Sequence, residues 1–341
     1  MPARNASPVR ASDPTQRLTG ALLGQALGDA LGVVVEAEPA KTAAAYVRDW
    51  LLTGRAGERG RRHFPFGQYS DDTQLARELL ISVREVGEWS PPAYARRIAE
   101  LFRDERDVGA GPGTRGAAHR LLSGASWRSA GTPAPYAGNG SAMRAGPLGV
   151  LFAGDADAMR DAAREQSLIT HLDPRCAAGA VAVAGAVALA VEPGPVHPDS
   201  FLETLAGWVG WEDASVSRAV AGVSDWLELD PAEAARHLHA SGLDPGRVDD
   251  WQGISAFVTP SVAWSIYAFL RTPDDYWATV CTAIAAGGDT DTMAAIAGAI
   301  AGARLGPSAL PQELLGRLND RGTWKAGELA ALAADCAPLC G

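Results

Sequence analysis

The chain of 341 residues has few cysteines, no apolar leader and no excess of basic residues. Its four cysteines, Cys176, Cys281, Cys336 and Cys340, include no CxxC pair, and no matching His/Cys pair accompanies the last two. This argues against a disulfide framework and a zinc site, and favours free thiols in a reducing cytoplasm. The first residues, MPARNASPVRASDPTQ, contain no apolar run of the kind a signal peptide needs.

Positive charge is also scarce, since 30 Lys and Arg stand against 40 Asp and Glu, a formal net charge of −10. Proteins that bind nucleic acid over an extended surface neutralise phosphates with Lys and Arg, so we expect no such footprint. The most apolar run, at 177–191, is mostly Ala and Gly and is too short to cross a bilayer. We therefore expect no membrane segment here and predict a helix buried among other helices.

The alternation of polar and apolar residues that marks a half-buried strand is almost absent, whereas helical periodicity is common. Helices are predicted at 17–32, from Asp72 onward, at 91–105 and at 293–306. Glycines recur every four residues at 24, 28 and 32 and again at 298, 302 and 306, which indicates closely packed helices in a core.

These patterns predict an all-α fold, a compact bundle of tightly crossed helices. We expect one domain over residues 17–341 after a flexible tail over residues 1–16. The less regular stretch from 191–200 to 244–253 is interpreted as an insertion within that domain.

Two adjacent carboxylates, Asp71 and Asp72, stand between Ser70 and Thr73 at the start of a predicted helix. Ser70 is a favourable N-cap, and acidic residues in a first turn interact favourably with the helix dipole. Helix capping alone can therefore explain this segment, although adjacent carboxylates are also suited to bind cations.

A second acidic cluster resembles the first, because Asp289, Asp291 and Thr292 follow two glycines and precede an apolar helix. If the two helix starts face each other, they gather four carboxylates and two hydroxyl oxygens. Oxygen ligands of this kind suit Mg²⁺, Mn²⁺ or Ca²⁺ rather than zinc. Without a cation the carboxylates would repel one another or take up protons, so we predict a site for two divalent cations.

Three further stretches carry polar groups near glycine or proline. The turn 138–141 has bare backbone N–H groups that can bind a diphosphate, although it could also be a tight helix entry. Asp107 precedes a glycine-rich turn and a helix that it could equally cap. His171 stands before Asp173, which begins another helix, and a lone histidine is more often structural.

These stretches, in this order, resemble the ADP-ribosylglycohydrolase family, which includes dinitrogenase-reductase-activating glycohydrolase and the vertebrate ADP-ribosylhydrolases. The resemblance runs from GALLGQALGDALGVVVE (20–36) to GGDTDTMAAIAGAIAGARLG (287–306), with SDDT, GNGSAMRAGPLG and a Thr-His pair between them. It implies an all-α, single-domain orthogonal helical bundle with a centre of two Mg²⁺ or Mn²⁺ ions, which removes ADP-ribose from modified targets.

The resemblance also implies roles for individual residues. The metal ligands would be Ser70, where the family commonly has threonine, together with Asp71, Asp72, Asp289, Asp291 and Thr292. The diphosphate and distal ribose would be bound by Gly138, Asn139, Gly140, Ser141, Met143 and His171. Glu36 matches a glutamate near the metals, and Asp107 matches an acid/base of the arginine-directed branch, so these two would be the catalytic carboxylates.

The residues at 134–137, APYA, depart from the Lys-Gly-Ser segment of the serine-directed vertebrate branch, which favours an arginine-type N-glycosidic linkage. The expected reaction is hydrolysis at the anomeric carbon of the distal ribose, with ADP-ribose as a product. The alternatives are O-acetyl-ADP-ribose, ADP-ribosylated nucleic acid or a small ADP-ribosylated metabolite as substrate, or a protein that binds ADP-ribose without catalysis. We expect a cytoplasmic monomer.

Overall fold

The structure, a computed structural model, describes residues 13–61, 64–242 and 251–341. Within these residues it contains sixteen α-helices and no strand, which confirms the predicted all-α fold. The helices are α1 (Pro14–Gly32), α2 (Ala40–Tyr46), α3 (Asp71–Val86), α4 (Pro91–Arg103), α5 (Pro112–Leu122), α6 (Gly146–Leu151), α7 (Ala156–Leu168), α8 (Pro174–Ala190), α9 (Pro198–Val209), α10 (Ala214–Ala221), α11 (Pro231–His239), α12 (Val258–Arg271), α13 (Tyr276–Ala285), α14 (Thr290–Leu305), α15 (Gln312–Leu315) and α16 (Ala326–Cys336).

The first helix begins three residues earlier than predicted, because Asp13 and Pro14 form a helix start. Asp13 Oδ1 accepts a hydrogen bond from Gln16 N at 2.9 Å, and proline at the first helical position needs no amide partner. Residues 14–16 therefore belong to the helical domain rather than to the predicted tail, whose residues 1–12 lie outside the described part. The stretch Pro14–Val35 is long and apolar enough to cross a membrane, but 94% of its most apolar window is buried inside the molecule, as in a core helix.

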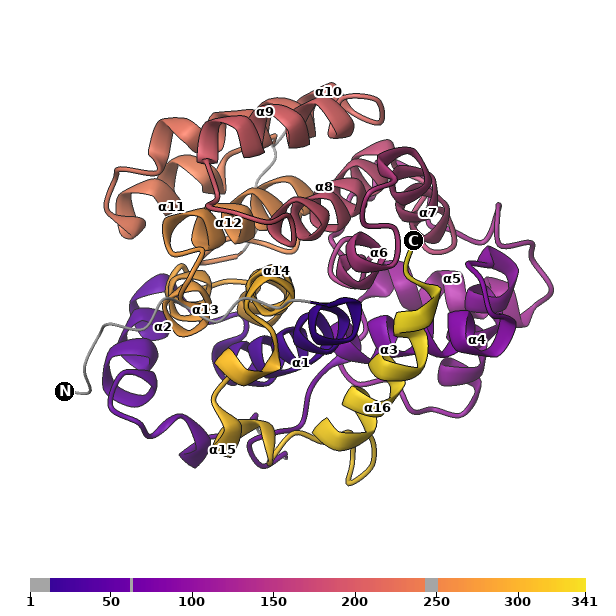
Figure 1. The fold of residues 1–341 in the computed structure, drawn as a ribbon, viewed down its shortest axis with the longest axis horizontal. Coiled ribbons are helices and arrows are strands. Elements are labelled where there is room, and N and C mark those ends of the chain that lie inside the picture. The colour runs from indigo at the N-terminus through magenta and orange to yellow at the C-terminus, as the bar shows by residue number, and fades with distance from the viewer. Residues whose placement is uncertain (1–12, 62–63, 243–250) are drawn as a thin grey trace.

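Helices α1 and α14 lie side by side and antiparallel at the centre of the molecule (Figure 1). Gly20, Gly24, Gly28 and Gly32 of α1 face α14 so closely that a Cβ on any of them would lie 2.1–2.3 Å from an α14 carbonyl oxygen. The predicted close packing at the glycine repeat is thus confirmed. Its consequence is that the last turn of α1 lies beside the first turn of α14.

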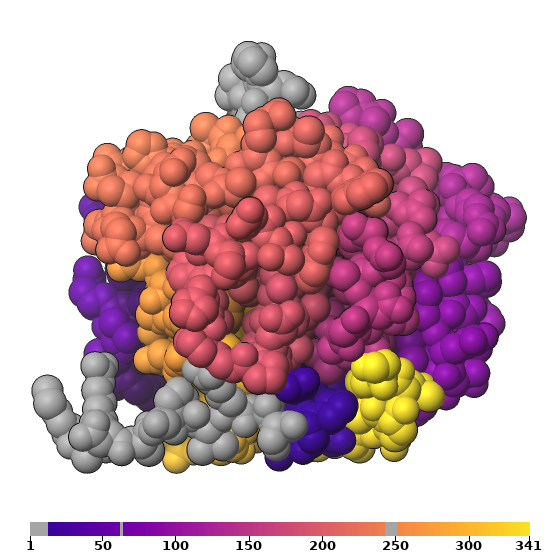
Figure 2. All heavy atoms as spheres, turned by 45° about the horizontal axis from the view of Figure 1, so that its top comes forward, coloured from indigo at the N-terminus to yellow at the C-terminus, as the bar shows by residue number. Residues whose placement is uncertain are grey.

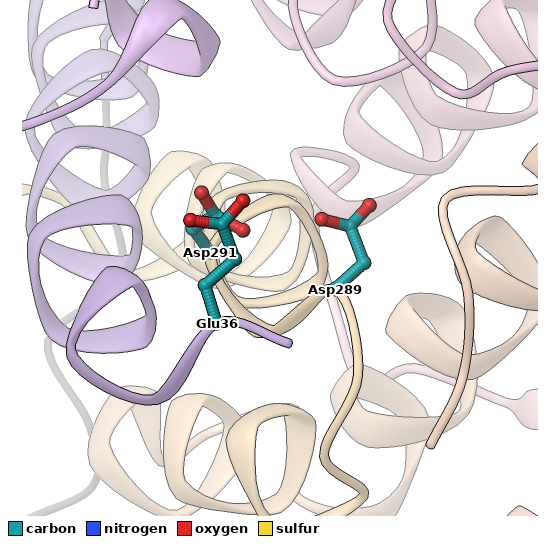
Figure 3. A group of neighbouring side chains, drawn as sticks. All are labelled: Glu36, Asp289 and Asp291. Atoms are coloured by element: carbon teal, nitrogen blue, oxygen red, sulfur yellow. The ribbon is translucent and has the colours of Figure 1, made fainter. Parts of the chain in front are cut away.

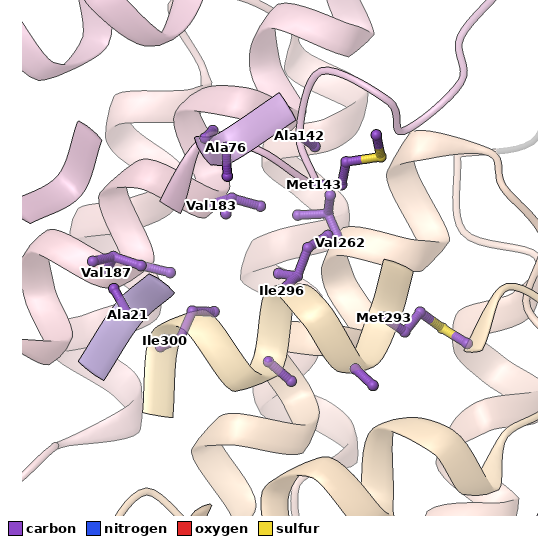
Figure 4. Packing of buried hydrophobic residues seen from close by; sticks show 14 of the residues in the cluster. Ala21, Ala76, Ala142, Met143, Val183, Val187, Val262, Met293, Ile296 and Ile300 are labelled. Atoms are coloured by element: carbon purple, nitrogen blue, oxygen red, sulfur yellow. The ribbon is translucent and has the colours of Figure 1, made fainter. Parts of the chain in front are cut away.

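Other apolar helices cover the central pair. Helices α8 and α12 pack on α14, where Val183, Val187 and Val262 lie near Ile296 and Ile300 in the buried core (Figure 4). Each fully buried Val or Ile side chain stabilises the fold by about 1.5–3 kcal/mol relative to an exposed one. The centre of the bundle is therefore a rigid platform for the loops at its ends.

The stretch predicted as an insertion forms an outer layer of the same bundle. Helices α9, α10 and α11 lie over α8 and α12, and together they occupy much of the face in Figure 2. Phe201 of α9 packs against Phe269 of α12, with ring centroids 5.9 Å apart. Residues 243–250, also within the predicted insertion, lie outside the described part.

Candidate active site

The last turns of α1 bring the two acidic clusters together. The Asp29 carboxylate accepts hydrogen bonds from Ser70 N at 2.9 Å, and from Thr73 N at 3.2 Å and Thr73 Oγ1 at 2.6 Å. Three residues further along, the Gly32 carbonyl accepts from Thr290 Oγ1 at 2.8 Å. The starts of α3 and α14 are therefore fixed at the same end of α1, as the prediction required.

The start of α3 uses only part of its polar groups for capping. Ser70 Oγ accepts from Asp72 N at 3.3 Å and donates to Asp72 Oδ2 at 3.0 Å, so the predicted N-cap is confirmed. Asp71 and Asp72 are nevertheless buried, with 6% and 2% exposed. Asp72 Oδ1 is buried without a hydrogen-bond partner among the described residues. Capping alone leaves this oxygen unexplained.

At the start of α14, Asp289 occupies the N-cap position without capping the helix. Its carboxylate instead accepts a hydrogen bond from Asn139 Nδ2 at 2.5 Å. Carboxylate oxygens of Glu36, Asp289 and Asp291 lie within 4.8 Å of one another, with Glu36 and Asp289 reaching the group from different segments (Figure 3). Asp291 Oδ1 is a second buried oxygen without a partner in the described part of the chain.

Glu36 belongs to a segment that is itself anchored to the α14 loop. Ala37 N donates to the Gly288 carbonyl at 2.8 Å, and Gly288 N donates to Glu38 O at 2.9 Å. Arg61 Nη2 lies 2.5 Å from Glu36 Oε2, which places a cation beside the acidic cluster. The structure thus brings Glu36 together with the acidic cluster at the start of α14.

Proton affinity in this cluster is abnormal. Burial, and then the charge of neighbouring carboxylates, raises the pKa of Asp71, Asp72 and Asp291 well above the usual range. Burial raises the pKa of Asp289 to about 6, although the Asn139 hydrogen bond lowers it. Ionising these carboxyls together in the interior therefore costs free energy, a cost that divalent cations would relieve. The oxygen donors, two of which have no hydrogen-bond partner within the described residues, fit Mg²⁺ or Mn²⁺.

Metal binding should therefore depend on pH in a defined direction. Folding raises the pKa of the Asp289 carboxyl, so its ionisation costs no stability below the unfolded value of 3.8, and the full cost is present above the folded value of about 6. We expect Mn²⁺ to raise the melting temperature, relative to chelator, by about 5 °C more at pH 7.5 than at pH 5. This assumes about 2.7 kcal/mol at a hundredfold excess over Kd and roughly 2 °C per kcal/mol.

Differential scanning fluorimetry at both pH values, with Mn²⁺ or with chelator, measures this difference. Each pH serves as its own reference, because titrating groups outside the cluster affect the protein equally with and without the ion. An equal or larger Mn²⁺ effect at pH 5 would contradict competition between protons and metal at these carboxylates.

The glycine-rich turn adjoins the acidic cluster through Asn139. Besides its bond to Asp289, Asn139 donates from its backbone N to Ala256 O at 3.0 Å. Gln25 of α1 secures the same region, because its Nε2 donates to Met143 O at 3.1 Å and to Asp72 O at 2.8 Å. One turn is therefore linked by hydrogen bonds to both acidic helix starts.

His171 and the start of α5 lie against the other side of this turn. A Cβ on Gly140 would lie 3.0 Å from Thr114 Oγ1 and 3.1 Å from His171 Cε1. A Cβ on Gly113 would lie 2.3 Å from the Tyr136 ring and 3.0 Å from His171 Nε2. A side chain at Gly113 would overlap the Tyr136 ring, and one at Gly140 would require Thr114 or His171 to shift slightly.

His171 is a neutral hydrogen-bonding group. Burial, and then the charge of Arg144, lowers its pKa to about 3. Thr170 Oγ1 accepts from Arg144 Nη2 at 2.8 Å and lies 2.8 Å from His171 Nδ1. A hydroxyl can donate once and accept twice, so Thr170 Oγ1 can pair with Nδ1 in either tautomer of the ring, whose Nε2 lies on the side of Gly113.

Two of the predicted residues are placed differently from the rest. The Ser141 hydroxyl is fully buried, where it donates to Cys176 O at 3.2 Å and accepts from Ser167 Oγ at 3.0 Å. The Asp107 carboxylate accepts from Arg115 Nη2 at 3.0 Å, and α5 is capped by Gly111, so Asp107 does not cap that helix. The Asp107 segment still contacts the acidic cluster, because the backbone carbonyl of Val108 accepts a hydrogen bond from Asp71 N at 2.7 Å.

Sequence reasoning missed Gln25 and Asp29, which hold the site together from α1. They stand four residues apart and therefore share one face of a helix whose other residues from 18 to 32 are almost all apolar or glycine. Both are fully buried. Two polar residues on one face of an otherwise apolar helix are the signal that could have found them.

Two pockets lie near these loops. One, of about 130 Å³, adjoins the turn and is lined by Tyr136, Ala137, Gly138, Trp251, Ser255, Ala256 and Phe257. A larger one, of about 660 Å³, lies between α2, α11 and residues 251–254, and none of the predicted site residues lines it. The smaller pocket is the one continuous with the candidate site.

Comparison with known proteins gives the family. The model for the ADP-ribosylglycohydrolase family matches residues 10–340, and the chain belongs to this family. Proteins named ADP-ribosylhydrolase ARH3 are similar to it. The protein of Gallus gallus is 30% identical over 342 residues, which cover 89% of each chain. The protein of Xenopus tropicalis is 31% identical over 323 residues, which cover 86% of this chain and 89% of the relative.

A solved structure described as an ADP-ribosylglycohydrolase-related protein complex has the same fold. It superimposes with a TM-score of 0.70 and 26% identity over 96% of this chain and 99% of that one. The predicted family and the predicted helical bundle are therefore confirmed. The family also supports the predicted class of activity, that of a hydrolase acting on ADP-ribosylated substrates.

Proposed function

We propose that this protein is an ADP-ribosylhydrolase that uses two divalent cations, Mg²⁺ or Mn²⁺, to cleave the bond at the anomeric carbon of the distal ribose. The observation that carries the proposal is the hydrogen bond between Asn139 of the glycine-rich turn and Asp289 of the acidic cluster. It joins a turn suited to a diphosphate to carboxylates suited to cations. ADP-ribose carries its diphosphate and its distal ribose adjacent to each other.

The cations would be held by Ser70, Asp71, Asp72, Asp289, Asp291 and Thr292, and would supply positive charge for orienting the ribose hydroxyls. The chain supplies the rest of the binding site. Backbone N–H groups of Gly138, Gly140 and Ser141 can bind the diphosphate, whereas that of Asn139 already donates to Ala256 O. His171 can form a further hydrogen bond to the substrate through Nε2. The rings of Tyr136, Trp251 and Phe257 in the adjoining pocket offer stacking surfaces for the adenine.

The chemical step consumes one water. Its oxygen forms a bond to the anomeric carbon, the bond from that carbon to the leaving group breaks, and positive charge develops on the sugar as it does so. One carboxylate accepts a proton from the water, and the leaving group gains a proton. Glu36 lies in the acidic cluster and Asp107 adjoins it through its backbone, so these two are the proposed proton carriers.

The proposal also specifies which linkage between ADP-ribose and its target is cleaved. An arginine-type linkage rests on Asp107, whose carboxylate already accepts a hydrogen bond from the Arg115 guanidinium and can do the same for a substrate guanidinium. An oxygen-linked substrate, such as a serine-linked ADP-ribose or O-acetyl-ADP-ribose, is the second candidate. It is favoured by Glu36, the carboxylate that shares the cluster with Asp289 and Asp291.

A panel of purified substrates tests this function. Arginine-linked, serine-linked and nucleic-acid-linked ADP-ribose and O-acetyl-ADP-ribose are each incubated with Mg²⁺, Mn²⁺ or chelator, and free ADP-ribose is quantified by mass spectrometry. We expect release that requires a divalent cation and is fastest with the arginine linkage. Binding of ADP-ribose without release under every condition would identify a non-catalytic binder instead.

The proposed place of action is a reducing cytoplasm. All four cysteines are free, and Cys176, Cys281 and Cys336 are buried. Thiols in such positions are stable where glutathione keeps them reduced. We therefore expect the protein to retain full activity when the substrate panel is assayed in a reducing buffer.

A further inference from the structure

The loop between α15 and α16, residues 319–324, contacts the segment that carries Asp107. The guanidinium of Arg321 donates to Glu105 O at 3.2 Å and to Asp107 O at 3.3 Å. Arg321 N also donates to Gln68 Oε1 at 2.7 Å, just before the start of α3. A segment more than 200 residues away in sequence therefore holds the backbone of residues 105–107 and the side chain of Gln68, which precedes the acidic helix start.

Asp320 of this loop is the centre of a buried network. It is 6% exposed, and its carboxylate accepts from Arg77 Nη1 at 2.7 Å and from Gln74 Nε2 at 2.9 Å. Gln68 Nε2 adds a longer bond of 3.3 Å. All three donors belong to α3 or the residues just before it, so Asp320 fixes the loop to the helix that begins with Asp71.

Gln74 links Asp320 to the Asp107 segment by hydrogen bonds. Its Nε2 donates to Arg106 O at 2.9 Å, and its Oε1 accepts from Val108 N at 2.9 Å. Val108 O in turn accepts from Asp71 N at 2.7 Å. A carboxylate can only accept, so Asp320, like the Arg106 carbonyl, bonds the NH₂ end of Gln74 and leaves its oxygen end for Val108.

Backbone strain is concentrated in the same place. Among the described residues, four that are not glycine have positive φ: Ala37 at 64°, Glu105 at 52°, Arg321 at 50° and Trp324 at 47°. Such conformations cost about 1–2 kcal/mol each and persist where surrounding contacts hold them. Three of the four lie in the two segments that Arg321 joins, and Ala37 follows Glu36. The loops around the acidic cluster are thus held in one conformation against their local preference.

We propose that Asp320 is a positioning residue for the hydrolytic site. By orienting the Gln74 amide, its carboxylate sets the backbone of residues 106–108, which presents Asp107 and anchors the amide of Asp71. The inference rests on the proposed function in that Asp107 and Asp71 are assigned to the reaction. Asp320 itself is not expected to contact the substrate.

The test compares two changes that each neutralise one carboxylate bound to Arg77. Asp320→Asn removes the negative charge that accepts from Gln74 Nε2, and the asparagine amide can present either its oxygen or its NH₂ group to Gln74. Glu78→Gln is the matched control, since Glu78 is 1% exposed by side chain and its two oxygens bind Arg77 and Arg97, with no bond to residues 106–108. Both variants should lose similar stability in urea unfolding.

Turnover should separate the two variants. We expect Asp320→Asn to lower kcat by about 10- to 100-fold, the effect of a small misplacement of reacting groups. KM should change little, because the network makes no contact with the glycine-rich turn. Gln74→Met, combined with Asp320→Asn, should add little further loss because both act through one path. A kcat for Asp320→Asn equal to that of Glu78→Gln would overturn the proposal.

A second measurement needs no substrate. Hydrogen exchange at the Val108 amide, which donates to Gln74, should be at least tenfold faster in Asp320→Asn than in the wild type, and unchanged in Glu78→Gln. If no substrate of the panel is hydrolysed by the wild type, the proposed function fails while this readout still tests positioning. Unchanged exchange at Val108 in Asp320→Asn would overturn the positioning role whatever the activity.

Discussion

Asp291→Asn should abolish metal-dependent hydrolysis without unfolding the protein. Asp291 is 4% exposed, and one of its oxygens is buried without a hydrogen-bond partner in the described part of the chain. An amide keeps the shape of the side chain but removes half of the oxygen donors and the negative charge. We expect kcat/KM to fall about 1,000-fold, equivalent to about 4 kcal/mol of transition-state stabilisation.

The same change should leave the metal-free protein as stable as the wild type or more stable. Burial and the charge of Asp289 both disfavour the ionised form of Asp291, so neutralising it removes repulsion in the absence of a cation. The Mn²⁺-dependent rise in melting temperature should disappear in parallel with activity. Lost activity with unchanged metal-free stability distinguishes a missing ligand from a misfolded variant.

Asp155→Asn is the matched control for this experiment. Asp155 is an exposed N-cap of α7 whose Oδ1 accepts from Ala158 N at 3.0 Å, and asparagine preserves such a cap. Activity and the Mn²⁺ response should both be unchanged there. If Asp291→Asn kept near-normal turnover in the presence of chelator, the acidic cluster would not be the metal centre.

Much of this site could be predicted because its chemistry is local in sequence. Ser70, Asp71 and Asp72 are adjacent, and a hydroxyl before two carboxylates at a helix start is visible without a structure. The four-residue glycine repeat likewise fixes which faces of α1 and α14 can touch. Once these faces are in contact, the antiparallel arrangement of the two helices places Thr290, and with it the second cluster, beside Gly32 at the end of α1.

The groups that support the site could not be predicted in the same way. Asp29 acts on residues 41 and 44 positions away, and Asp320 acts on Gln74 across 246 positions. Their own neighbours in sequence give no indication of these partners. The direction of the Asp107 carboxylate could not be predicted either, because it is set by a hydrogen bond from Arg115 on helix α5. Long-range hydrogen bonds of this kind follow from the packed fold and not from local preference.

The largest loss of stability is expected from Gly28→Ala. The added Cβ would lie 2.1 Å from the Ala294 carbonyl oxygen and 2.6 Å from its carbon, both backbone atoms that cannot rotate away. Helices α1 and α14 would have to separate, at a cost of about 3 kcal/mol or more in the free energy of unfolding. Gly28 directly precedes Asp29, so Mn²⁺ affinity should fall as well.

Gly207→Ala is the control, because it makes the same chemical change in helix α9, where the new methyl group would have no described atom within 4 Å apart from its chain neighbours and its own helix backbone. Alanine there should stabilise the protein by about 0.5–1 kcal/mol, since glycine loses more backbone freedom on folding. Urea unfolding of both variants measures the contrast, and Mn²⁺ titration measures the effect on the cluster. A Gly28→Ala protein within about 1 kcal/mol of the wild type would show that the two helices are not held in backbone contact, and the basis for the meeting of the acidic clusters would fail with it.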